Sequence, residues 1–180
     1  MADERVIYLM KGTLVGLSAG FIVSLFRLGI EFILETVIEG YHFMQEQPIW
    51  LIPWVIFSVT AALIVGKLVK SEPNIKGSGI PQVEGQVQGL ISLNWWPVIW
   101  KKFIGGLLAI GSGLFLGREG PSIQLGSAVG QGISNLTKGD DVEEKILLSS
   151  GAGAGVAAAF NAPLAGLMFV LEEVHHNFSP

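Results

Sequence analysis

The sequence predicts an all-α integral membrane protein whose helices are repeatedly interrupted. Half of its 180 residues are hydrophobic and only 14% are charged, whereas an ordinary soluble domain carries about 25% charged residues. Its 24 glycines suit transmembrane helices, in which small residues let backbones approach closely. Long apolar runs alternate with short polar breaks that contain glycine and proline. A protein with so little charge to cover its surface is expected to meet lipid.

Four apolar runs are candidate membrane spans, because a helix needs about 20 apolar residues to cross a hydrocarbon core about 30 Å thick. They cover residues 9–33, 48–66, 97–117 and 146–171. The first contains Arg27 and Glu31, which are four residues apart and can pair on one helix face. The fourth is interrupted by Asn161-Ala-Pro163.

Two further segments, 78–93 and 119–136, are glycine-rich and only partly apolar. We expect helices there that begin inside the membrane, each reached through an extended break. Such non-helical backbone is tolerated at that depth only where protein buries it or where it lines a watery cavity.

The distribution of charge predicts the orientation, because cytoplasmic segments carry an excess of Lys and Arg. One face would collect the basic residues before the first run and between the second and third: Arg5, Lys11, Lys67, Lys70, Lys76, Lys101 and Lys102. We therefore expect a multi-pass protein with a cytoplasmic N-terminus, in which Lys101 and Lys102 snorkel to the membrane surface. Residues 34–47 carry glutamates but no Lys or Arg, as an outer loop would, whereas the acidic stretch 140–144 cannot be assigned to a face.

Three breaks share one pattern, in which a short polar segment ends in proline. They are Gly77-Ser-Gly-Ile-Pro81, Gly117-Arg-Glu-Gly-Pro121 and Phe160-Asn-Ala-Pro163. Proline is favoured at the first position of a helix, so each break should lead into a helix N-terminus. The unpaired N–H groups and partial positive charge found there bind anions. The alternative is that these breaks are kinks that only pack helices together.

Glu119 lies at the second break, and a carboxylate at membrane depth marks function by default. It could occupy an anion site itself when charged and leave when protonated. The alternative is an ion pair with the adjacent Arg118, although neighbours on an extended segment point apart. Near the end of the fourth run, Glu172 or Glu173 could relay protons from a watery vestibule that Glu84 also faces; alternatively this is a solvated helix end.

Several other classes of protein fit the sequence poorly. The chain has no Cys, and no metal-ligand spacing or cofactor motif is recognisable. No basic patch interleaved with aromatic residues suggests nucleic acid. An intramembrane serine hydrolase would need a His near Ser78 or Ser112, but the only histidines, His42, His175 and His176, lie outside the apolar runs. A non-transporting scaffold would leave Glu119 unexplained.

With these motifs the sequence resembles the CLC family of chloride channels and proton-coupled chloride exchangers. The first two breaks match family motifs in order and spacing, and so does the segment 155–166, which contains the third. The resemblance implies that residues 1–180 form the first half of an inverted repeat, with tilted and re-entrant helices whose N-termini meet at an anion site. The second half, which supplies the pore tyrosine, has no counterpart here. It further implies a homodimer when complete, located in the plasma membrane.

The resemblance also implies roles for individual residues. An anion would be held by Ser78, Gly79 and Ile80 from the first motif, and by Gly117, Arg118 and Gly120 from the second. Glu119 would be the external gating glutamate, and Glu173 would match the internal proton-transfer glutamate of exchangers. This implies chloride/proton antiport, with a passive voltage- or pH-gated chloride channel as the alternative. One departure is Gln82, where many members carry Glu.

Overall fold

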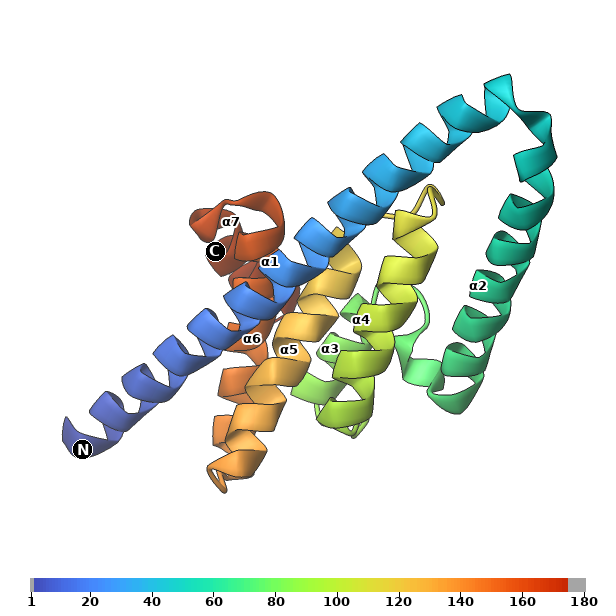
Figure 1. The fold of residues 1–180 in the computed structure, drawn as a ribbon. Helices are drawn as coiled ribbons and strands as arrows, with labels where there is room; N and C mark the ends of the chain where they lie inside the picture. Colours follow the sequence, from blue (N-terminus) through green and yellow to red (C-terminus); the bar gives the residue numbers. More distant parts are fainter. Residues whose placement is uncertain (1, 175–180) are drawn as a thin grey trace.

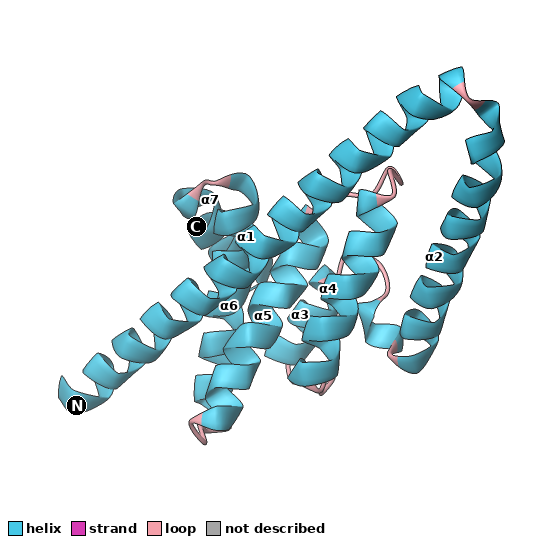
Figure 2. Ribbon diagram, viewed as in Figure 1, coloured by secondary structure: helices cyan, strands magenta, loops and turns pink. Residues whose placement is uncertain are grey.

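The computed structural model describes residues 2–174, which form helices joined by short loops, with no strand among them (Figures 1 and 2). Seven α-helices are labelled in this part of the chain: α1 (Ala2–Glu46), α2 (Leu51–Ser71), α3 (Ile80–Val87), α4 (Trp95–Gly111), α5 (Glu119–Leu136), α6 (Asp141–Phe160) and α7 (Pro163–Phe169). Two 3-10 turns, η1 (Pro48–Trp50) and η2 (Pro73–Ile75), and a π-helical turn, η3 (Val170–Val174), complete it. The predicted all-α fold is confirmed.

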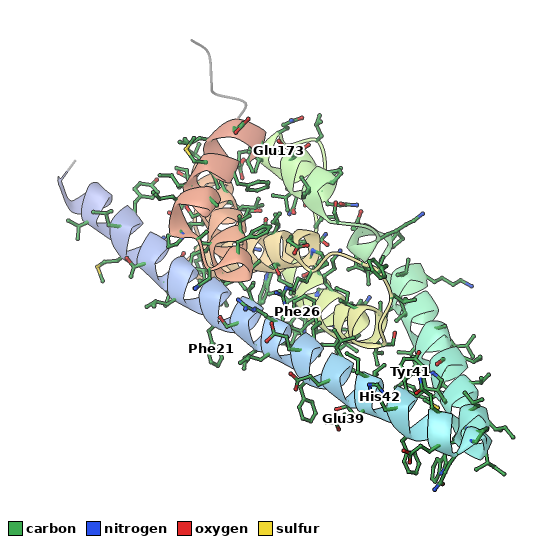
Figure 3. The ribbon with its side chains drawn as sticks, turned by 90° about the horizontal axis from the view of Figure 1, so that it is seen from above. Phe21, Phe26, Glu39, Tyr41, His42 and Glu173 are labelled. Atoms are coloured by element: carbon green, nitrogen blue, oxygen red, sulfur yellow. The ribbon has the colours of Figure 1, made fainter. Side chains whose placement is uncertain are left out.

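Helix α5 is the centre of the bundle. Every residue from Pro121 to Ser134 is buried, and α5 contacts α1, α3, α4 and α6. Helix α1 runs obliquely across α5 and α6, while α2 returns along the outer side of α4 (Figure 1). The inner face of α1 is marked by Phe26, which is fully buried and points into the bundle, whereas Phe21 points outward and is 65% exposed (Figure 3).

Helices α5 and α6 are packed backbone against backbone through glycines spaced four residues apart. A Cβ placed on Gly126 or Gly130 of α5 would collide with main-chain carbonyl oxygens of α6. The same holds for Gly151 and Gly155 of α6 against α5. Small residues at these positions are therefore required for the approach that buries α5.

The predicted boundaries are partly wrong, for reasons visible in the backbone. Helix α1 continues through the expected outer loop to Glu46, because no proline interrupts the chain before Pro48. The third run leaves the helix at Gly111 rather than Gly117, since Gly113 has a φ of +90°. The segment 78–93 is helical only over α3. By length and composition, 48–71 is the one segment among the described helices that meets the requirements for crossing a membrane.

The acidic stretch 140–144 begins α6. Its first residue, Asp140, caps the helix by accepting a hydrogen bond from the Glu143 N–H at 2.8 Å. The Glu143 carboxylate forms an ion pair with Lys11 of α1. This contact places the acidic stretch beside Lys11, and therefore on the face for which the sequence predicts the cytoplasm.

The glycine contact between α5 and α6 generates the first prediction. Gly130→Ala should lower the free energy of unfolding by about 1–3 kcal/mol, as overpacking of a tight interface does, because its methyl group meets main-chain atoms that cannot move aside. The midpoint of thermal unfolding of the purified protein in detergent measures this effect. Gly16→Ala is the matched control, since no atom lies within 4 Å of a Cβ there. Equal midpoints for both variants would contradict the close packing.

Candidate anion site

Two of the sequence breaks meet directly. A Cβ placed on Gly120, in the first turn of α5, would lie 2.6 Å from the Ser78 Cβ and 2.8 Å from both the Ser78 Cα and its carbonyl oxygen. Only a residue without a side chain fits against Ser78 here. The segment before α3 and the start of α5 are thus held in contact, although α3 and α4 lie between them in the chain.

Helix N-termini form at all three breaks, as predicted. Pro163 is the first residue of α7, Pro81 the second of α3 and Pro121 the third of α5. Proline at these positions sacrifices no helical hydrogen bond, because the first N–H groups of a helix have no partner within it.

The first turn of α5 leaves main-chain amides available, whereas the Ile80 amide of α3 is engaged by a side chain. In α5 the bond from Ser122 N–H to the Arg118 carbonyl oxygen, at 3.2 Å, is the first of the helix, so the amides before it have no helical acceptor. At α3 the Ile80 N–H donates to the Ser78 Oγ at 3.4 Å. A hydroxyl that accepts in this way keeps its own proton for donation to another group.

A cavity of about 430 Å³ opens beside the two breaks. Gly77 and Ser78 line it from the first break, and Gly117, Gly120 and Pro121 line it from the second. Apolar residues of α2 and α4 form most of the remaining wall: Val65, Leu68, Val69, Gly105, Gly106, Ala109 and Ile110. Ile75, Leu116 and three lysines, Lys76, Lys101 and Lys102, complete the lining. Polar backbone and lysines therefore face a hollow whose walls are mostly apolar.

Lys102 holds the first break in place. Its side chain lies inside the bundle at 4% exposure, and its Nζ donates to the carbonyl oxygens of Ile75 at 2.9 Å and of Gly77 at 2.7 Å. The prediction that Lys102 snorkels to the membrane surface is wrong. It points inward because the 3-10 turn η2 ends at Ile75 and the chain then runs on without a helix, which leaves the Ile75 and Gly77 carbonyl groups in need of a donor. No signal in the sequence distinguishes it from Lys101, which reaches the Ser71 carbonyl oxygen at 3.4 Å.

Of the two charged residues in the second break, Arg118 forms an ion pair among the described side chains and Glu119 does not. The Arg118 Nη1 donates to the Glu31 Oε1 at 2.8 Å, and the Arg27 Nε donates to the same oxygen at 3.0 Å. The predicted pair between Arg27 and Glu31 is thus confirmed, and Arg118 pairs with Glu31 rather than with Glu119. The Glu119 carboxylate is half-buried and has no hydrogen bond or ion pair to any residue within 6–174, the range whose side chains the structure describes.

The other predicted glutamates lie apart from this contact. Glu84 is half-buried on α3, while Glu172 and Glu173 are exposed on η3, which contacts α3. Figure 3 places Glu173 at the edge of the molecule beside α3. None of the three lines the cavity at Ser78.

The geometry does not assemble a serine hydrolase from the described residues. The Ser112 hydroxyl donates to the Ala109 carbonyl oxygen of its own helix at 3.0 Å. His42 lies towards the end of α1 that meets α2 (Figure 3). His175 and His176 lie outside the described residues.

An apolar helical bundle with interrupted helices, whose N-termini meet beside a cavity, defines an integral membrane protein of the broken-helix class. The family described as "Voltage gated chloride channel" matches residues 58–180. The chain belongs to this family.

The most informative relatives carry the name H(+)/Cl(-) exchange transporter ClcA. The chain is 41% identical to the protein of Vibrio parahaemolyticus over 174 residues and 38% identical to that of Cronobacter sakazakii. A solved structure described as a slow cyanobacterial Cl⁻/H⁺ antiporter superposes with a TM-score of 0.87 at 36% identity, over 93% of this chain and 40% of that one. The chain spans 37% of the length of the curated relatives. These names are those of transporters, not of hydrolases.

The anchoring by Lys102 generates the second prediction. Lys102→Met keeps the apolar stem but removes the donor from the Ile75 and Gly77 carbonyl oxygens, so we expect a loss of about 2–3 kcal/mol in the free energy of unfolding, as for hydrogen bonds to a charged group. Thermal unfolding in detergent measures the loss, and hydrogen exchange at the Ser78 amide should quicken.

Lys101→Met, one residue earlier, is the control, because the single hydrogen bond of Lys101 is longer and exposed. If both methionine variants melt alike and exchange alike, Lys102 does not anchor this segment.

Proposed function

We propose that this chain is the first half of a transmembrane chloride transporter that exchanges chloride for protons. The observation that carries the proposal is the contact between Ser78 and Gly120, because it brings two helix N-termini to one point. The exchange activity that the relatives' names state supports the same function. Chloride is then the substrate and the proton the coupled ion, and the cycle needs no cofactor.

The anion is held by partial charges rather than by formal cations. The Ser78 hydroxyl donates to the ion, together with main-chain amides near Gly79 and Ile80 of the first break. Main-chain groups of Gly117, Arg118 and Gly120 line the other side, because the Arg118 side chain is engaged by Glu31. Binding by dipoles is strong enough to admit an ion and weak enough to release it, which conduction requires.

Glu119 acts as the gate by competing with the anion. Its carboxylate has no cationic partner among the side chains of residues 6–174, so the helix N-termini that attract chloride also attract it. Protonation removes its charge and the attraction, and the side chain leaves the path. One proton is thereby exchanged against the anion that replaces the carboxylate.

Protons reach the gate from the opposite side through Glu173. Its exposed position on η3, next to α3, gives it access to a watery vestibule shared with Glu84 and Glu172. Since a passive channel needs no such relay, this arrangement favours exchange over channel behaviour.

The assembly that performs this cycle contains a second half of the inverted repeat, and two such units form a homodimer in the plasma membrane. Its N-terminus is cytoplasmic. The contacts of Lys11 with Glu143, near the start of α6, and of Lys101 with Ser71, at the end of α2, support this orientation. In Figure 1 the end of α2 and the loop between α5 and α6 lie on the same side of the bundle.

The gate is tested by Glu119→Gln in the complete transporter. We expect chloride flux to persist and chloride-driven proton movement to disappear, because an amide cannot carry the proton. Parallel recordings of chloride efflux and proton uptake in liposomes measure both. Coupling that stays at its normal ratio would refute this role for Glu119.

The internal relay is tested by Glu173→Gln, with Glu172→Gln as the matched neighbour, because successive residues of the helical turn η3 point in different directions. We expect proton flux to fall at least about tenfold in the first variant and to change little in the second, since a relay on the path carries most of the proton current. Intact proton flux in Glu173→Gln would favour the passive channel instead.

A further inference from the structure

One carboxylate in the chain bridges two arginines from different helices. Glu31 of α1 receives the Arg27 Nε and the Arg118 Nη1 on the same oxygen, at 3.0 Å and 2.8 Å. Arg118 immediately precedes Glu119 and is the N-cap residue of α5. The bridge therefore connects α1 to the start of α5.

The base of this bridge is rigid. Ile30, the neighbour of Glu31, and Phe26, one turn earlier, are buried in the core cluster that α1 shares with α4 and α5. The fit between α1 and α4 is close enough that a Cβ on Gly106 would meet the Phe26 ring at 2.6 Å, and one on Gly111 would meet Ile33 at 2.8 Å. Glu31 consequently extends from a part of α1 that cannot shift without repacking.

Glu31 is the anion that neutralises part of the positive charge of Arg27 and Arg118. Charged side chains in a membrane-spanning helix are costly unless they are paired, and here one anion serves two cations. If Glu31 loses its charge, the Arg118 guanidinium loses its partner next to Glu119. The carboxylate of the adjacent Glu119 and a transported anion could then take the place of Glu31.

We propose that Glu31 is a positioning residue that holds the Arg118 guanidinium towards α1, so that this guanidinium faces neither the gate nor the anion. The proposal rests on the proposed function. Its consequence is that a residue outside the three motifs sets how tightly the site holds an anion. Removing the charge of Glu31 should make the site bind chloride more tightly and release it more slowly.

The test uses the complete transporter reconstituted in liposomes, with chloride as the probe. In Glu31→Gln we expect the chloride concentration at half-maximal flux to fall and the maximal rate to fall with it, each by about tenfold, the effect of one added charge-assisted hydrogen bond. Calorimetric titration of the detergent-solubilised protein with chloride should show the same tightening. Glu35→Gln, one turn further along the same helix face, is the control and should leave both values unchanged.

Two further variants separate positioning from a merely structural role. Glu31→Gln combined with Arg118→Gln removes the released cation as well, and chloride affinity should return towards that of the unmodified protein. Arg27→Gln leaves the contact between Glu31 and Arg118 in place and should change affinity less than twofold. A double variant that binds chloride as tightly as Glu31→Gln alone, or a Glu31→Gln variant that matches Glu35→Gln, overturns the proposal. If the unmodified transporter moves no chloride at all, the proposed function fails instead.

Discussion

The approach of Ser78 to Gly120 is the constraint on which the site depends. Two helices that begin within an apolar bundle must satisfy their first amide groups without help from their own backbone. Because both helix N-termini lie at one point, their unpaired N–H groups can donate hydrogen bonds to the same small anion. The absence of a side chain at Gly120 is what makes the approach sterically feasible, so the chemistry of the site follows from a packing requirement.

Polar side chains of α5 hold the segment that contains α3 in place through hydrogen bonds. The Gln124 Nε2 donates to the Asn74 carbonyl oxygen at 2.8 Å, just before the first break. One and a half to two turns later, the Gln131 Nε2 donates to the Leu93 carbonyl oxygen at 2.9 Å, and its Oε1 accepts from Gln86 at 3.1 Å. Together with Lys102, these side chains satisfy the carbonyl groups of a segment that is helical only over α3. A non-helical segment inside a membrane protein needs such partners, because no water or lipid supplies them.

The sequence was sufficient for the fold class, for α5 and for the three helix beginnings, because glycine and proline determine backbone conformation locally. Hydropathy was less reliable for helix ends: no change in hydropathy marks Glu46 as the last residue of α1, or Gly111 as the last residue of α4. The inward direction of Lys102 and the pairing of Arg118 with Glu31 were also beyond sequence reasoning. Both depend on which groups from distant segments become neighbours, and a local pattern contains no information about that.

The length of α1 has a consequence for the surroundings of the protein. Its 45 residues extend about 68 Å at 1.5 Å per residue, whereas a bilayer with its headgroup layers measures about 40–45 Å. Such a rod cannot stand upright within the bilayer without protruding, and its oblique course across the bundle (Figure 1) shortens its projection on the membrane normal. Glu31 lies on α1 and pairs with Arg118 at the start of α5. A change in bilayer thickness that alters the tilt of α1 would therefore also move the first turn of α5.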